Sequence, residues 1–184
     1  MRQQTRRLTS LIDDLLLLAQ ADSGRITPEN ETINLSDLVR AALDDLDVLC
    51  SGKNIRQESD IPNSLTVRAD RRLISMVIQN LVENAAKYTR DGGSIRVTAG
   101  RDGIGVFVRV GNSGETISDE EAHRIFDRFR RGSSMGGHVA GHGLGLNIAR
   151  ELARVHGGDL ILVKSNEQNW VEFELHLPSS ADAL

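Results

Sequence analysis

Apolar residues near the start of the chain recur at spacings of three and four, with charged residues on the other faces. The stripe predicts an amphipathic helix that needs a helical partner, and it is formed by Leu8, Leu11, Ile12, Leu15, Leu18 and Ala19. The pattern stops at Gly24, a residue type that favours the end of a helix, and Pro28 marks the loop that follows. We therefore expect a boundary near residue 25, with a helical appendage over 1–25 and a domain over 26–184.

The rest of the chain alternates between helical and extended patterns. Four helices are expected: one capped by Ser36 and ending near residue 52, one capped by Asp70 and ending near residue 87, a short one from Ser118, and one over 143–156. Short alternating apolar runs predict strands between them, at 33–35, 55–59, 65–69, 94–99, 105–110, 160–164 and 171–177, with turns at 101–103 and 166–169.

Helices and pairs of strands follow one another along the chain. This order predicts an α/β fold, a two-layer sandwich in which a mixed β-sheet carries helices on one face, and not a doubly wound nucleotide fold. A glycine-rich stretch at 132–143 has little apolar content, so it fits a mobile loop better than a regular element.

Composition and charge narrow the possible functions. The 184 residues are 39% hydrophobic and 26% charged, which is typical of a globular protein with one full core. The net charge of −4 gives no attraction for nucleic acid or anionic lipid. A single cysteine, Cys50, excludes an intrachain disulfide and a cysteine-type zinc site, and it fits a reducing, cytoplasmic setting. No apolar run approaches the ~20 residues that cross a bilayer, and the uncapped start in mid-helix suggests a piece of a longer protein.

Two polar features carry candidate chemistry. Asn80 and Asn84 lie four apart on one predicted helix, with Lys87 one turn further on, and paired carboxamide oxygens suit Mg²⁺. Taken alone, the pair is more simply explained as a solvated helix face. The glycine-rich segment at 141–146 exposes backbone amides just before a helix begins, which is favourable for binding phosphate, although such turns also serve as plain helix caps.

Four segments together resemble the asparagine, glycine and phenylalanine boxes of bacterial sensor histidine kinases of two-component systems, within the gyrase, chaperone, histidine kinase and MutL-like ATPases. They are NLVENAAKYT at 80–89, NSG at 112–114, IFDRF at 125–129 and GHGLGL at 141–146. The resemblance implies a Bergerat-type fold, with 26–184 as the catalytic ATP-binding domain. It also implies that 1–25 is the second helix of a dimerisation and histidine-phosphotransfer hairpin whose first helix is absent.

The resemblance assigns roles to particular residues. It implies Asn80 and Asn84 as Mg²⁺ ligands, Lys87 as a phosphate contact, Tyr88 as a wall of the nucleotide pocket, and Arg130 with 132–143 as a lid. The whole set expected to bind ATP and Mg²⁺ is Asn80, Asn84, Lys87, Tyr88, Asn112, Gly114, Ile117, Phe129, Arg130, Gly141, His142, Gly143, Leu144, Gly145 and Leu146. His142 is otherwise expected to be an exposed loop residue, and Phe126 and Phe129 to pack at the base of the lid.

The first glycine box departs from the family's commoner pattern. Asn112 stands where aspartate is usual, and Thr116 where a second glycine is usual. The aspartate would accept the adenine amino group; the asparagine oxygen can still accept from that group, and its amide can donate to ring N1. We therefore expect adenine recognition to be reshaped and not abolished, with Gly114 supplying the backbone freedom at this place.

The resemblance implies a domain that transfers the ATP γ-phosphoryl group to a histidine, for relay to an aspartate of a response regulator receiver domain. None of the five histidines, His123, His138, His142, His156 and His176, stands in the family's phosphoacceptor pattern, so this chain alone should not autophosphorylate. The expected partners are the receiver domain and a second copy, joined through the hairpin helices. Membrane contact, such as an inner-membrane anchor, would come only from upstream segments.

Two other readings remain open at this point. An anti-sigma-factor-type serine kinase shares these boxes, although the preceding amphipathic helix and the phenylalanine box argue against it. A degenerate ATP-binding scaffold would have lost base recognition through Asn112. Gyrase-like and chaperone-like activities are less expected because the water-activating glutamate of those proteins corresponds in place to Asn80, so ATP hydrolysis should be slow.

Overall fold

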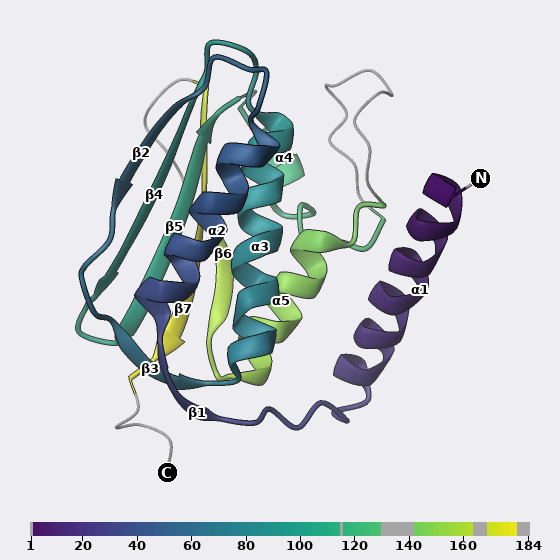
Figure 1. Ribbon diagram of the computed structural model, residues 1–184. Coiled ribbons are helices and arrows are strands. Elements are labelled where there is room, and N and C mark those ends of the chain that lie inside the picture. Colours follow the sequence, from purple (N-terminus) through teal and green to yellow (C-terminus); the bar gives the residue numbers. More distant parts are fainter. Residues whose placement is uncertain (1, 115, 130–141, 164–168, 180–184) are drawn as a thin grey trace.

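A mixed five-stranded sheet forms one layer of the molecule (Figure 1). The computed structural model describes residues 2–114, 116–129, 142–163 and 169–179. The strands lie in the order β2 (Arg56–Asp60), β4 (Ser94–Arg101), β5 (Gly105–Ser113), β7 (Trp170–Pro178) and β6 (Asp159–Val163). β2 pairs with β4 in parallel, whereas the other pairs are antiparallel. The end of the strand expected at 160–164 and most of the turn at 166–169 lie outside the described residues.

Helices α2 (Leu35–Leu49), α3 (Arg71–Tyr88) and α5 (Gly145–Val155) cover one face of this sheet (Figure 1). The central helix α3 contacts both of the others. Its buried side chains, which include Ile74, Val77 and Leu81, meet the inward-facing side chains of the strands, where buried and half-buried positions alternate along β7. Each such aliphatic side chain contributes roughly 1.5–3 kcal/mol by its burial. The predicted fold class, with helices on one face of a mixed sheet, is confirmed.

The N-terminus of α3 is capped as the sequence predicts. The Asp70 side chain accepts hydrogen bonds from the backbone N–H groups of Leu73 and Glu29, each at 3.0 Å. Burial of this carboxylate would raise its pKa, but the backbone hydrogen bonds outweigh it, so the pKa of Asp70 lies below its usual value. The short helix α4 (Asp119–Ala122) also begins as predicted, with Ser118 and Glu121 forming a reciprocal capping box.

The predicted cap of α2 is wrong. The helix begins at Leu35 with Asn34 in the N-cap position, so Ser36 lies inside the first turn, fully buried, and its Oγ has no hydrogen-bond partner among the described residues. The cause is tertiary: the N–H of Leu35 donates to the carbonyl oxygen of Leu65 at 2.7 Å, and Asn34 Oδ1 accepts from the N–H of Leu65 at 3.2 Å. The chain therefore enters the helix two residues earlier than predicted, and α2 ends at Leu49, short of residue 52.

Two strands that follow each other in the sequence lie in different sheets. β1 (Glu31–Asn34) and β3 (Thr66–Ala69) form a separate antiparallel pair, while β2 joins the main sheet. The predicted alternation of helices with pairs of strands implies that 55–59 and 65–69 pair with each other, which is wrong. Ile33, Val67 and Ala69 are buried in the small sheet, so β3 gains more apolar contact from β1 than the fully exposed β2 could offer.

The hairpin between β4 and β5 forms at the predicted turn. Asp102 Oδ1 accepts from the N–H groups of Ile104 and Gly105, each at 2.9 Å, which closes the turn. By contrast, α5 begins at Gly145 and not at Gly143, because Gly143 has a left-handed φ of 71° that an α-helix does not allow. Most of the predicted loop at 132–143 lies outside the part of the chain that the structure describes.

Helix α1 (Arg2–Asp22) runs beside α5 (Figure 1). Leu18 is buried in the core, and at the end of the helix both carboxylate oxygens of Asp22 accept from Arg128 Nη2, at 2.5 and 2.6 Å. The predicted amphipathic helix is confirmed. Part of its apolar stripe, Leu8, Ile12 and Leu15, remains exposed, and so does the neighbouring Leu16. No helix within the described ranges is long and apolar enough to cross a membrane.

Candidate functional site

The candidate site forms where the middle of α3 meets the start of α5. The two helices are held at their other ends, because the N–H of Asp70 donates to His156 Nε2 at 3.0 Å and His156 Nδ1 lies 2.7 Å from the carbonyl oxygen of Leu152. Asn80 follows Asp70 by ten residues along α3, and Gly145 precedes His156 by eleven along α5. At 1.5 Å per residue both distances along the helix axes are about 15 Å, so in these antiparallel helices Asn80 and Gly145 lie at the same level.

Asn80 presents its carboxamide oxygen to the start of α5. Its Nδ2 donates to the carbonyl oxygen of Met76 at 3.0 Å, which only the amide nitrogen can do, so Oδ1 is the atom that faces outward. A Cβ atom added to Gly145 would lie 2.6 Å from this oxygen. The first N–H groups of α5 have no partner within their own helix. A carboxamide oxygen and free backbone donors therefore meet at one place.

Asn84 and Lys87 continue along α3 beyond Asn80, and both are half-buried. Asn84 follows Asn80 by four residues, which places both carboxamides on one face of the helix. Lys87 lies in the last turn, where its ammonium is favoured by the helix dipole, and its Nζ is 4.9 Å from the ring centroid of Tyr88. The helix thus carries a row of polar groups that ends at an aromatic ring.

A second group of predicted residues lies at the C-terminal end of α3. Asn112 near the end of β5 is only 3% exposed, and its Nδ2 makes one long hydrogen bond, 3.4 Å, to the carbonyl oxygen of Ser113. A Cβ at Gly114 would lie 3.0 Å from that Nδ2 and 3.4 Å from the carbonyl oxygen of Tyr88. Asn112, Gly114 and Tyr88 are therefore neighbours, and the buried amide of Asn112 keeps hydrogen-bonding capacity to spare.

The two phenylalanines of the 125–129 segment behave differently. Phe126 packs edge-on against Phe173 with ring centroids 6.1 Å apart, and the Arg150 guanidinium lies 4.5 Å from its centroid. Phe129 is 59% exposed. The predicted packing role is right for Phe126 and wrong for Phe129, because a left-handed backbone at Phe129, with φ 60°, breaks the helical spacing that would place both rings on one side.

The residues before α5 approach helix α1. Leu144 is buried and anchors the start of α5, while Ile117 and Leu146 pack against the core from partly buried positions. His142 is half-buried, so the expected exposed loop histidine is wrong in that respect. It lies near Asp14 of α1, whose pKa is raised mainly by burial, although the His142 charge opposes the shift. Gly141 and Arg130, also predicted for the site, lie outside the described residues.

Sequence reasoning missed three residues that hold the Phe126 segment in place. Asn147 Nδ2 donates to the carbonyl oxygen of Phe126 at 2.8 Å. Arg150 makes a two-pronged ion pair with Asp159, with distances of 2.9 and 3.1 Å, and this hydrogen bonding lowers the pKa of Asp159. The sequence contained a signal for these residues: Asn147 and Arg150 lie three apart on a predicted helix and therefore share a face.

Comparison with known proteins shows which family this chain resembles. Residues 69–181 match the profile of the family described as histidine kinase-, DNA gyrase B-, and HSP90-like ATPases. The signal transduction histidine-protein kinase BaeS of Escherichia coli is 30% identical over 159 residues, which cover 86% of this chain and 34% of BaeS. The chain spans only about a third of the length of its first curated relatives, from 26% to 34%.

Solved structures of two histidine kinases are also similar. Full-length ShkA in complex with AMPPNP shares 25% of its residues at a TM-score of 0.78, and the match covers 100% of this chain and 38% of ShkA. ThkA, in complex with the response regulator protein TrrA, shares 28% at a TM-score of 0.77, and the match covers 98% of this chain and 50% of that chain. The match to ShkA covers the full chain, including α1, and the match to ThkA covers nearly all of it.

Proposed function

We propose that this chain, which belongs to the family of histidine kinase-, DNA gyrase B- and HSP90-like ATPases, binds ATP with Mg²⁺ between α3 and α5 as the catalytic domain of a two-component sensor histidine kinase. The observation that carries the proposal is the contact between Asn80 Oδ1 and the start of α5 at Gly145. It brings a metal-type oxygen ligand within reach of backbone donors suited to phosphate.

The residues at this place fit a magnesium–phosphate group. Asn80 and Asn84 offer two carboxamide oxygens, the ligand type that this hard cation takes together with phosphate oxygens and water. The missing Cβ of Gly145 leaves room for Asn80 Oδ1 beside the first turn of α5, so a metal held by this oxygen would lie next to N–H groups that suit phosphate. Lys87 adds a positive charge at the far end of the row. Bound Mg²⁺ would neutralise charge on the phosphate oxygens, which is the main task in phosphoryl transfer.

The adenine base would lie at the C-terminal end of α3. Asn112 is buried there with a poorly used amide, so its oxygen can accept from the adenine amino group while its nitrogen donates to ring N1. Tyr88 borders the same space, and Gly114 leaves the Asn112 amide unobstructed. Ile117, Phe129, Arg130, Gly141, His142, Gly143, Leu144 and Leu146 complete the proposed nucleotide site.

In the proposed reaction, an imidazole nitrogen of an acceptor histidine takes the γ-phosphoryl group. The bond between the γ-phosphorus and its bridging oxygen breaks, and ADP leaves. The acceptor lies on a hairpin whose second helix is formed by residues 1–25 and whose first helix is not among these residues. Two copies join through their hairpin helices, and a response regulator's aspartate then takes the phosphoryl group. ThkA, which is similar over 98% of this chain, was crystallised with such a regulator. We place the domain in the cytoplasm. Any anchor in the inner membrane would belong to segments other than these 184 residues.

Calorimetry with ATP, in the presence and absence of Mg²⁺, tests the proposal on the chain as it exists. We expect micromolar to submillimolar binding that weakens at least about 100-fold without Mg²⁺, a loss of about 2.8 kcal/mol. Incubation with ATP and a separately supplied hairpin carrying the acceptor histidine should then yield acid-labile phosphohistidine. Absence of binding near millimolar ATP would favour a scaffold, and acid-stable phosphoserine on a protein substrate would favour a serine kinase.

Replacing Gly145 with alanine should lower the affinity for ATP with Mg²⁺ about tenfold, or ~1.4 kcal/mol, while the free energy of unfolding stays the same or rises because alanine suits a helix better. The new Cβ, 2.6 Å from Asn80 Oδ1, forces that side chain to turn and to lose its hydrogen bond to Met76. Calorimetry and urea unfolding measure the two effects.

A double-mutant cycle gives the control for this prediction. In the Asn80→Ala background no Oδ1 remains to be displaced, so adding Gly145→Ala should change the affinity little further. Additive losses from the two substitutions would show that Gly145 acts on ATP independently of Asn80.

A further inference from the structure

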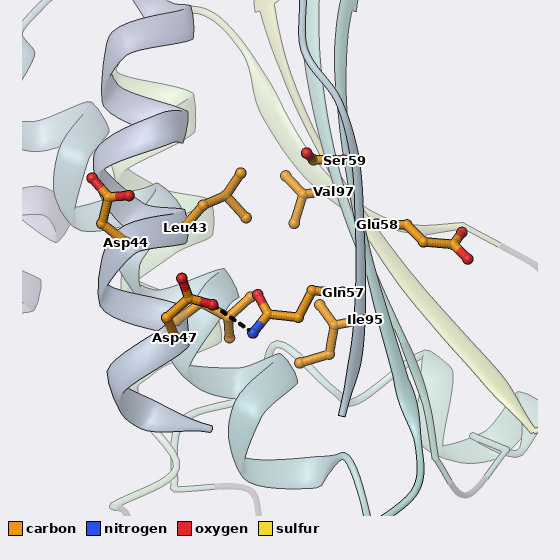
Figure 2. Close-up of a pocket in the computed structure, with 9 residues that line it drawn as sticks. Leu43, Asp44, Asp47, Gln57, Glu58, Ser59, Ile95 and Val97 are labelled. Atoms are coloured by element: carbon orange, nitrogen blue, oxygen red, sulfur yellow. Dashed lines mark hydrogen bonds between the residues drawn. The ribbon is translucent and has the colours of Figure 1, made fainter. Parts of the chain in front are cut away.

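A cleft lies between α2 and the edge of the main sheet, away from the nucleotide site (Figure 2). Its volume is about 200 Å³. Leu43 and Leu46 of α2 and Ile95 and Val97 of β4 form an apolar floor, and Asp44, Asp47, Gln57 and Ser59 are polar lining residues. Figure 2 shows Gln57 reaching across to Asp47, where Nε2 donates to Oδ1 at 2.8 Å, while Glu58 points away from the cleft.

The strand beside the cleft has an open edge. β2 pairs only with β4 within the described ranges, and all five of its residues are exposed. The N–H of Arg56 donates to the carbonyl oxygen of Gly93, toward β4. Because backbone groups alternate along a strand, those of Gln57 and Ser59 point to the open side. The same two side chains lie toward α2, so a chain added to this edge would face the cleft with alternate side chains.

The cleft's size and lining define what can fill it. At about 200 Å³ it is smaller than the roughly 300–1,000 Å³ of small-molecule sites, so it suits one long side chain better than a metabolite. Asp44 and Asp47 form no ion pair with any described residue, and they lie next to an apolar floor. A lysine or arginine side chain matches this arrangement, because its aliphatic stem can cover the leucines and valine while its cationic head meets the Asp47 carboxylate, with the Asp44 carboxylate on the far side of α2 adding negative charge (Figure 2).

We propose that an extended segment of a partner protein adds to the open edge of β2 and places a lysine or arginine side chain in the cleft between α2 and β4. The negative charge of Asp47 and Asp44 selects the basic segment, and the charged residues at every second position of the strand, Arg56, Glu58 and Asp60, discourage unspecific pairing. The sheet order puts β2 and β6 at opposite edges, and α5, which forms part of the nucleotide site, contacts β6. The partner can therefore bind while ATP occupies its own site.

Selection from a displayed library of random ten-residue peptides on the full chain tests this surface. The matched targets are the double variant Asp44→Asn with Asp47→Asn, and Asp45→Asn on the same helix, which does not line the cleft. We expect the wild-type chain and Asp45→Asn to enrich lysine or arginine flanked by β-branched residues at alternate positions. The double variant should bind the enriched peptides at least about tenfold more weakly. Equal thermal unfolding of all three proteins verifies their folding.

Amide hydrogen exchange supplies the second readout. A bound peptide from the selection should protect the N–H groups of Gln57 and Ser59, because these are the donors that strand addition uses. No enrichment of basic residues over the input library would overturn the proposal. So would enriched peptides that bind the double variant equally well, or that leave both amides exchanging freely. If spermidine bound in the cleft without displacing a selected peptide from β2, the cleft would be a site for small amines. That result would also contradict strand addition.

Discussion

The Asn84→Ala variant is expected to lose Mg²⁺-dependent binding of ATP, with an affinity at least about 100-fold below that of the wild-type chain. The loss of groups that only support a metal ligand costs about 10–100-fold, and Asn84 is proposed to be a ligand itself. It lies one helical turn after Asn80, half-buried, on the face of α3 that carries the other carboxamide. Calorimetric titration with ATP, with and without Mg²⁺, measures the effect.

The quantity that tests the assignment is the ratio of the ATP affinities measured with and without Mg²⁺. Without the metal, the variant and the wild-type chain should bind ATP with similar, low affinity, because the base and phosphate contacts are unchanged. Gln79→Ala serves as the control on the same helix, since Gln79 Nε2 bonds Glu83 on another face at 3.2 Å. If Asn84→Ala kept the same dependence on Mg²⁺ as Gln79→Ala, the assignment of the metal site would be wrong.

The Gly105→Ala variant is expected to be strongly destabilised, by roughly 3 kcal/mol or more in the free energy of unfolding. Gly105 opens β5 and pairs with Pro178 of β7. A Cβ there would overlap the carbonyl oxygen of Leu177, and it would also lie 3.1 Å from His176 Cε1. The obstructing oxygen belongs to the backbone, so relief requires the strands to separate. Urea unfolding monitored by circular dichroism gives the value.

Gly103→Ala in the same hairpin is the control. A Cβ at Gly103 meets nothing within 4 Å, and its φ is not left-handed, so the substitution should change the free energy of unfolding by less than about 0.5 kcal/mol. Similar midpoints for the two alanine variants would show that β5 and β7 can shift to accept the extra carbon.

The structural features that the sequence predicts correctly depend on residues only a few positions away in the chain. The cap at Asp70 needs only the N–H of Leu73, and the turn at Asp102 needs only the next three residues. The same holds for the paired carboxamides of Asn80 and Asn84, because four residues are one turn of a helix. The fold class followed from the order of such local elements.

The features that sequence missed depend on contacts between distant segments. Ser36 was displaced from the cap because Leu65, thirty residues later, bonds Leu35 and Asn34. The segment containing Phe129 is tied through its neighbour Arg128 to Asp22, at the end of α1. β3 pairs with β1 and not with β2, because the buried side chains of β3 require an apolar neighbour. No periodicity within one element carries that information.

The parallel pairing of β2 with β4 also bears on how the molecule folds. Parallel neighbours cannot be joined by a tight turn, so the chain passes through β3 and the whole of α3 before β4 can meet β2. Closing that long loop costs entropy before the contact between the two strands can offset it, so we expect this edge to form late in folding. The strand that forms late is also the one that detaches at least cost, which makes the margin beside α2 the most readily opened part of the sheet.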